Sequence, residues 1–255
     1  MKKIPAPQGI RFFDGPFPCL VVAPHGPVIN GEYQNDIRTG VIAEAVHHAL
    51  GCKAIINDRF FKPKGNITKS RQDFLLDLFR IDHAGKVPGL LEYIRDSAFG
   101  PGKTLVLWVH GISDTVALSQ AEYHTPQGLF DRVPEDLHAL IGYGQGGDPK
   151  TGEAQERLSA RRATVDQFAR DLTQSGMITL PTAKEASNFR GRDAKRLNQW
   201  FNHLGLGPDR VESLQLEIRE KDFRDSESAA LKTAAIIAGA IKSLLETWEN
   251  QPAAV

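Results

Sequence analysis

The fold is decided by one stretch, residues 20–57, which reads LVVAPHGPVINGEYQNDIRTGVIAEAVHHALGCKAIIN. It opens with apolar residues that stop at a proline, as a buried strand does. From Asp36, apolar residues recur every three or four positions, which predicts a helix that ends at Gly51, and KAIIN (53–57) predicts a second strand. A strand, a helix and a strand in fewer than 40 residues are typical of a parallel crossover, so we expect an α/β sheet.

The same alternation of strands and helices continues along the chain. The strongest strand pattern is TLVLWVH (104–110), and LQLEI (214–218) predicts a late strand. Helices are expected at 87–99, 153–174, 193–204 and 226–248, and a further strand at 177–180. No repeat or linker divides the chain, so we expect a single α/β domain over residues 1–255, in which helices flank a mostly parallel or mixed central sheet in three layers. A glycine-rich insertion or lid is expected at about 118–152.

Composition and charge exclude several classes of protein. Of the 255 residues, 41% are hydrophobic and 24% are charged, and 31 basic residues balance 31 acidic ones. A nucleic-acid-binding protein usually carries a basic excess on one face, so we expect no nucleic-acid partner. No run reaches the roughly 20 apolar residues that span a bilayer, and the N-terminus does not resemble a signal peptide, so we expect a cytoplasmic protein with no membrane partner. Cys19 and Cys52 are expected to be buried free thiols.

Three predicted strands end on residues that can bind or react. His25 follows the first strand, His110 ends the strongest strand, and Glu217 lies near the end of a late strand. In open α/β sheets, ligands bind at the carboxyl ends of the strands. Two imidazoles and a carboxylate are the protein ligands of many catalytic zinc sites, which keep a fourth position open. For the carboxylate we choose Glu32; Asp36 is the alternative, but we assign it as the N-cap of the helix that follows it.

This combination of side chains suits hydrolysis. Imidazole nitrogen and carboxylate oxygen bind zinc well, although ligand type alone does not separate zinc from other divalent metals. A bound metal lowers the pKa of water and polarises a carbonyl oxygen. Glu217, as a carboxylate outside the ligand set, would take the proton from water and pass it to a leaving nitrogen. The alternative interpretation is that each histidine is a hydrogen-bonded loop residue, which is common after a strand.

Four motifs follow one another along the chain: APHGP (23–27) with the apolar helix behind it, SRQDFLLDLFR (70–80), the strand that ends in HG (110–111), and LQLEIRE (214–220). In this order they resemble the N-formylglutamate amidohydrolase family, which is related to the zinc carboxypeptidases, aspartoacylase and the phage-type poly-γ-glutamate hydrolases. The resemblance implies a zinc carboxypeptidase-like fold and one zinc ion held by His25, Glu32 and His110. It also implies that Glu217 is the general acid and base.

The resemblance further implies how the substrate is held. In relatives, an arginine and a DLNR-like motif hold the substrate carboxylate and polarise its carbonyl, and the matching residues here are Arg71 and the run from Asp77 to Arg80. The run reads DLFR, so Phe79 stands where relatives have asparagine, and a hydrogen-bonding group is lost. Arg71 and Arg80 are expected to bind the carboxylate, since guanidinium suits bidentate recognition. Arg192 is the candidate for a second anchor.

We therefore expect a metal-dependent amidohydrolase that cleaves the amide of an acidic N-acyl amino acid similar to N-formylglutamate, or a peptidase that acts on γ-glutamyl bonds. Its partner would be a small molecule that carries a carboxylate. A non-hydrolytic module that binds a metal or a carboxylate on the same fold is the alternative, because Phe79 departs from the family pattern. A nucleotide site at residues 141–153 is not favoured, since this stretch lacks the GK[ST] ending of a phosphate-binding loop. The sequence leaves the oligomeric state open.

Overall fold

The structure, a computed structural model of the chain, describes residues 9–25, 36–58, 77–98, 102–114, 129, 136–146, 155–182 and 189–249. Within these residues, seven strands form one sheet in the order β1-β3-β2-β4-β7-β5-β6. The strands are β1 (Ile10–Phe13), β2 (Phe17–Ala23), β3 (Cys52–Asn57), β4 (Thr104–Ile112), β5 (Ala139–Gly142), β6 (Thr179–Pro181) and β7 (Val211–Arg219).

The sheet is mixed and mostly parallel. β2 pairs in parallel with β3 and β4, β4 pairs in parallel with β7, and β5 pairs in parallel with β6. β1 and β5 run antiparallel to β3 and β7, respectively. The β2–helix–β3 crossover that residues 20–57 predict is therefore confirmed, and with it the expected class of fold.

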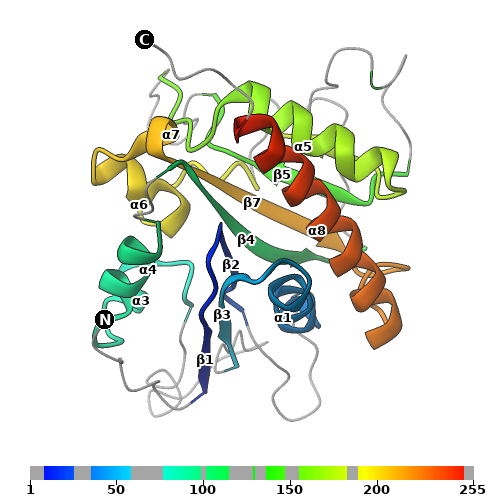
Figure 1. Cartoon of the computed structure of the whole chain (residues 1–255), viewed down its shortest axis with the longest axis horizontal. Helices are drawn as coiled ribbons and strands as arrows, with labels where there is room; N and C mark the ends of the chain where they lie inside the picture. Colours follow the sequence, from blue (N-terminus) through cyan, green and yellow to red (C-terminus); the bar gives the residue numbers. More distant parts are fainter. Residues whose placement is uncertain are drawn as a thin grey trace.

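Helices cover both faces of the sheet (Figure 1). Three of them pack on one face in the larger hydrophobic cluster: α1 (Thr39–Leu50), α5 (Arg162–Gln174) and α8 (Glu227–Glu249). Another three pack on the opposite face in a second cluster: α3 (Ile81–Ala84), α4 (Leu90–Ala98) and α6 (Leu197–His203). The short helix α7 (Gly207–Arg210) leads directly into β7. The three layers expected from the sequence are thus present.

The strand β2 shows why the central strands are continuous apolar runs. Val21 belongs to the larger cluster, whereas Val22 belongs to the cluster on the other face, and both are fully buried. Because successive side chains of a strand point to opposite faces, a strand covered on both faces needs apolar residues at every position. The same reasoning explains the run from Leu105 to Val109 in β4, which is buried throughout.

The start of α1 differs from the sequence prediction. Asp36 as the N-cap would place the first helical residue at position 37, whereas α1 begins at Thr39 and its N-cap is Arg38 in the left-handed conformation at φ 61°. The interpretation of Asp36 as the N-cap is therefore wrong. At the other end the prediction is confirmed: Gly51 has a φ of 64°, and its N–H donates to the carbonyl of His47 at 2.8 Å. Glycine suits this position because it lacks the Cβ that makes positive φ costly.

Two short strands were not predicted. β1 at the sheet edge has only four residues, and β5 lies inside the stretch that the sequence assigns to a glycine-rich insertion or lid. Residues 139–146 are buried, and the first four of them form β5 of the sheet. The other described residues of that stretch are 129 and 136–138; the rest lies outside the described residues.

The closing helix α8 is long and apolar enough, by length and composition, to cross a membrane, although the sequence led us to expect no such segment. More than half of its apolar window is buried inside the protein. Ile237 and Ile241, for example, lie in the larger hydrophobic cluster with residues of α1 and α5. Its apolar character is accounted for by this packing, which is typical of a core helix.

Candidate metal centre

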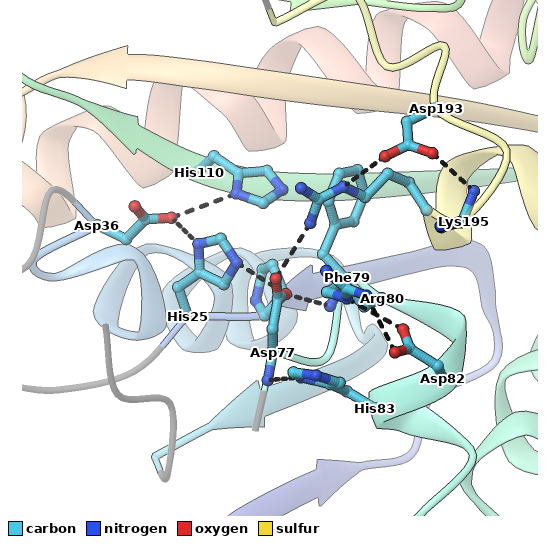
Figure 2. A network of polar contacts seen from close by, with 12 residues as sticks. His25, Asp36, Asp77, Phe79, Arg80, Asp82, His83, His110, Asp193 and Lys195 are labelled. Atoms are coloured by element: carbon cyan, nitrogen blue, oxygen red, sulfur yellow. Dashed lines mark hydrogen bonds and ion pairs between the residues drawn. The ribbon is translucent and has the colours of Figure 1, made fainter. Parts of the chain in front are cut away.

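Three polar side chains meet beside the carboxyl ends of the central parallel strands. His25 lies two residues beyond β2, His110 lies near the end of β4, and Asp36 lies three residues before α1. One ligand atom from each lies within 4.8 Å of the others, so this group could hold a metal ion. The two imidazole rings are 4.7 Å apart, centroid to centroid, and the carboxylate lies beside them (Figure 2).

The carboxylate of Asp36 joins the two histidines. Nδ1 of His25 donates to its Oδ2 at 2.7 Å, and Nδ1 of His110 donates to the same oxygen at 3.2 Å. Because its side chain contacts the two histidines, Asp36 is not the N-cap of α1. Glu32, which the sequence favoured as the carboxylate ligand, lies outside the described residues, so its assignment stays a prediction.

Side chains bind the backbone next to His25 and Asp36 and so fix the position of both residues. Asn57 at the end of β3 donates to the carbonyl of Pro24 at 2.7 Å, just before His25. The hydroxyl of Thr39 lies 2.9 Å from the carbonyl oxygen of Asp36 and 3.3 Å from that of His25. The first residue of α1 thus ties the loop before it to the end of β2.

Charge at the site favours a cation. Burial opposes a positive charge on His25, but Asp36 and Asp77 outweigh it and raise the pKa of this imidazole to about 10. Burial also raises the pKa of Asp36, but the two imidazoles lower it well below its ordinary range. Two ionised carboxylates around one imidazole therefore stabilise a positive charge, which either a proton or a metal ion can supply.

His110 gives an independent sign that a ligand fits here. Its Nε2 atom is buried and has no hydrogen-bond partner among the described residues. A buried polar atom without a partner costs about 1–3 kcal/mol, so such an atom usually has a function. Two imidazoles and a carboxylate are also the donor types that divalent transition metals prefer. By this test the residues fit a divalent metal.

Asp77 holds His25 from the side opposite to Asp36. Nε2 of His25 donates to Oδ1 of Asp77 at 3.0 Å, and the N–H of Phe79 donates to the same oxygen at 2.9 Å. Nη1 of Arg196 donates to Oδ2 of Asp77 at 3.1 Å. Burial raises the pKa of Asp77, but His25 and Arg196 lower it below its ordinary range. A carboxylate on the second ring nitrogen fixes the orientation and tautomer of a ligand histidine.

Phe79, where the sequence departs from the pattern of the family it resembles, forms an apolar wall of the site. Its ring lies 4.5 Å from that of His110 and 5.2 Å from that of Trp108, and the residue is 4% exposed. The guanidinium carbon of Arg196 lies 5.6 Å from its centre, within the range of a cation–π contact. The packed ring thus contacts both His110 and Arg196.

Glu217, the predicted acid–base residue, lies near the end of β7. It pairs with His110 across β4 and β7, so both side chains point to the same face of the sheet. The carboxyl is buried, and Nε2 of Gln215 donates to it. Burial raises the pKa of Glu217 above its ordinary value, and His110 opposes this shift. A carboxyl with a raised pKa is suited to take up and release a proton near neutral pH.

The three predicted substrate arginines have different surroundings. Arg80 forms a two-fold contact with Asp82, at 3.0 Å from Nε and from Nη2, and its side chain is 37% exposed. Arg192 is buried and donates to the carbonyls of Gly146 and Gln155 at 2.7 and 2.5 Å. Arg71 lies outside the described residues. Binding of a substrate carboxylate by these arginines stays a prediction.

Sequence reasoning missed the place of Arg196. It assigned this residue no role in the site, whereas the structure joins it to Asp77 and Phe79, next to His25. More than 100 residues separate Arg196 from Asp77 in the sequence, so no local spacing reveals this contact. The backbone bridge between Arg80 and Arg196 brings the two segments together.

Comparison with known proteins supports the fold, and the function has to be argued from the geometry of the site. A scan against protein-family models and a search of curated proteins gave no match. Solved structures do match, and they define a zinc carboxypeptidase-like fold. An N-formylglutamate amidohydrolase from Ralstonia eutropha JMP134 is 11% identical, with 95% of this chain and 99% of that chain covered and a TM-score of 0.54.

Two further structures are similar along nearly their whole length. The gene product Atu2144 from Agrobacterium tumefaciens is 10% identical, with 96% of this chain and 97% of that chain covered and a TM-score of 0.55. A bacteriophage poly-γ-glutamate hydrolase is 13% identical, with 97% and 92% covered and a TM-score of 0.48. At 10–11% identity, the likeness to the first two structures shows a shared fold and nothing about a shared substrate.

Proposed function

We propose that the protein is a metal-dependent amidohydrolase that cleaves the amide bond of an acidic N-acyl amino acid. The observation that carries this proposal is the convergence of His25, Asp36 and His110, with the buried Glu217 paired to His110 across the sheet. The choice of substrate class rests on the resemblance of the four sequence motifs to the N-formylglutamate amidohydrolase family.

His25 and His110 would hold the metal, together with Asp36 or the predicted ligand Glu32. Zinc is the metal we propose, because imidazole and carboxylate ligands suit it, and other divalent ions can share such a site. When bound, such an ion polarises a carbonyl oxygen and lowers the pKa of a water molecule. Asp77 keeps the imidazole of His25 in position through the hydrogen bond on Nε2.

Glu217 moves the proton in the proposed reaction. Its ionised carboxylate accepts a proton from the attacking water as the oxygen adds to the amide carbonyl carbon. The protonated carboxyl then gives that proton to the amide nitrogen as the carbon–nitrogen bond breaks, which yields a carboxylic acid and an amine. Burial supports both steps, because it raises the pKa of Glu217 and brings its two protonation states closer in free energy.

The substrate carboxylate would be held by arginine. Arg71 and Arg80 are the anchors that the resemblance implies, and Arg192 is the second anchor proposed from the sequence. Arg196 joins these candidates, because its side chain is 32% exposed while it contacts Asp77 beside the metal centre. Guanidinium groups bind carboxylates through two parallel hydrogen bonds, so a small acidic substrate suits this surface.

A module that binds a metal or a carboxylate without hydrolysis is the second candidate. Phe79 favours it, because the ring takes the place of a group that would donate a hydrogen bond to a carbonyl oxygen. The first candidate hydrolyses an amide bond, whereas the second binds its ligand without releasing an amine. A peptidase acting on γ-glutamyl bonds remains within the first candidate, since it uses the same acid–base chemistry.

Replacing Glu217 by glutamine tests the proposed reaction. Glutamine keeps the shape of the side chain but cannot take the proton, so we expect kcat to fall about 10²- to 10⁴-fold while the metal content stays unchanged. Turnover is measured as amine release from a panel of N-acyl amino acids. Glu212→Gln serves as the control, because Glu212 is a buried carboxylate at the opposite end of β7. Unchanged turnover in Glu217→Gln, or no amine release by the wild type, contradicts the proposal.

A further inference from the structure

One buried arginine connects the segments that carry the site. Arg224 is fully buried and follows β7 by five residues. Its guanidinium donates three hydrogen bonds to backbone carbonyls: Nε to Ile218 at 2.9 Å, Nη1 to Ile37 at 2.9 Å, and Nη2 to Ile112 at 3.0 Å. All three acceptors are main-chain oxygens, so the bonds depend on backbone position and not on the identity of the side chains.

Each acceptor lies one or two positions after a site residue in the sequence. Ile37 directly follows Asp36, and Ile218 directly follows Glu217. Ile112 is the last residue of β4, two positions after His110. One planar group therefore spans the loop before α1 and the ends of β4 and β7.

A hydrogen bond from Arg38 to Arg224 links the same two segments in the opposite direction. Nη1 of Arg38 donates to the carbonyl of Arg224 at 2.9 Å, and Arg38 is the residue held at φ 61° directly before α1. The N–H of Arg224 donates to the carbonyl of Glu220 at 2.9 Å, which fixes the turn after β7. The loop of Asp36 is thus bound to the segment of Arg224 through its backbone at Ile37 and through the side chain of Arg38.

We propose that Arg224 is a positioning residue of the metal centre, which sets the distances between Asp36, His110 and Glu217 without touching the metal or the substrate. A guanidinium suits this role because its donors are fixed in one plane, whereas the ammonium of lysine offers three donors from a single atom. The inference rests on the proposed function, in which Asp36 and His110 hold the metal and Glu217 moves the proton. Groups that orient metal ligands typically change metal affinity about 10- to 100-fold when they are removed.

A purely structural role for Arg224 predicts something different. Loss of three buried hydrogen bonds lowers the stability of the fold wherever it happens, but metal affinity changes only when ligand positions change. Glu212 provides the matched comparison. It is fully buried in β7 and joins Lys103, the N–H of Arg161 and the hydroxyl of Thr164, at the end of the strand away from Glu217.

The experiment compares Arg224→Lys, Arg224→Met and Glu212→Gln with the wild type. Full-length proteins are stripped of metal, checked for fold and Tm by circular dichroism, and titrated with Zn²⁺ by calorimetry. We expect all three variants to have a lower Tm. Zinc affinity should fall about 10- to 100-fold in both Arg224 variants and stay unchanged in Glu212→Gln. Where turnover is measured, kcat should fall more than KM rises.

Wild-type zinc affinity in folded Arg224 variants overturns the inference and leaves the proposed function standing, whereas a wild type that binds no divalent metal overturns both. If the Arg224 variants do not fold, Arg38→Met decides, because it removes the hydrogen bond from Arg38 to the carbonyl of Arg224 and leaves the Arg224 guanidinium in place. A weaker zinc affinity at unchanged Tm supports the inference, and an unchanged affinity overturns it.

Discussion

His25 is held between two carboxylates, and this arrangement makes it the centre of positive charge in the site. Its two ring nitrogens donate to Asp36 and Asp77, so the protein without metal holds a proton that an ordinary imidazole would lose near neutral pH. A metal ion can replace that proton and satisfy the same carboxylates. A proton and a metal ion therefore compete for the imidazole of His25.

Metal binding is expected to release a proton from His25. The pKa of this group in the folded apoprotein is about 10, above the ordinary value of 6.5, so the imidazole is protonated at pH 7 and must lose its proton to coordinate a metal. Metal affinity should therefore rise with pH up to about pH 10. Calorimetry at pH 7 in buffers of different ionisation enthalpy should show about one proton released per ion. Binding without proton release, or with a pH-independent affinity, contradicts this account.

Asp77 is expected to matter for metal affinity through His25 alone. Asp77→Asn keeps the size of the side chain but removes the charge that Nε2 of His25 contacts, so we expect zinc affinity to fall about 10-fold or more with the fold retained. Asp82→Asn is the control, because Asp82 lies in the same segment and pairs with Arg80 at the surface. Equal zinc affinities of the two variants would mean that Asp77 does not orient the ligand.

At the scale of elements, the central strands were the most predictable part of the structure. β4 is covered on both faces, and the sequence shows it as an unbroken apolar run from Leu105 to Val109. In β7, apolar residues mostly alternate with buried polar ones, which also predicts a strand. Their ends carry His110 and Glu217, which is why these two residues could be picked out without a structure. The short strands β1 and β5 give no such run and were missed.

The start of α1 shows where the local rules fail. Aspartate before a helix usually caps it, and a sequence offers no way to see that two distant histidines compete for the same carboxylate. In the structure, Asp36 contacts both histidines and the helix begins without a side-chain cap. Arg196 and Arg224 were missed for a related reason, because their partners are distant in the sequence and become neighbours only when the sheet forms.

The closing helix α8 is expected to stabilise the protein through its buried stripe. Ile241 is fully buried in the larger cluster, whereas Leu231 on the same helix is 48% exposed. We expect Ile241→Ala to lower the free energy of unfolding by about 2–5 kcal/mol. Leu231→Ala, at the exposed position, should change it by less than about 0.5 kcal/mol. Urea unfolding measures both; similar losses in the two variants would show that the helix is not packed as described.

At the scale of the whole molecule, the sheet brings together residues that the sequence spreads over nearly 200 positions. His25 follows β2, and Glu217 lies in β7. Both strands pair with β4, which lies between them and supplies His110. Parallel pairing makes the carboxyl ends of these strands meet at one edge, so their order in the sheet is enough to assemble the site. The topology therefore explains how three separate segments form one centre, and the polar contacts of Asp36, Asp77 and Arg224 explain how it is held.

The fold-level likeness to an N-formylglutamate amidohydrolase covers almost the whole of both chains, but the sequences share few residues. What the sequence could predict was the class of fold and the strand-end histidines with their buried glutamate. The place of Asp36 between the two histidines, the contact of Asp77 with His25 and the arginines that connect the segments required coordinates. These are contacts between side chains and backbone from different elements, and no spacing along the chain encodes them.

Metal content is the measurement that tests the central claim most directly. Wild type, His110→Ala and His203→Ala are loaded with zinc, dialysed and analysed for zinc per chain; His203 is an exposed histidine that contacts the carbonyl of Ala194. The account predicts about one zinc ion per chain in the wild type and in His203→Ala, and its loss in His110→Ala. A wild type that retains no zinc, or a His110→Ala variant that retains it as the wild type does, contradicts the claim that His25, Asp36 and His110 form one metal centre.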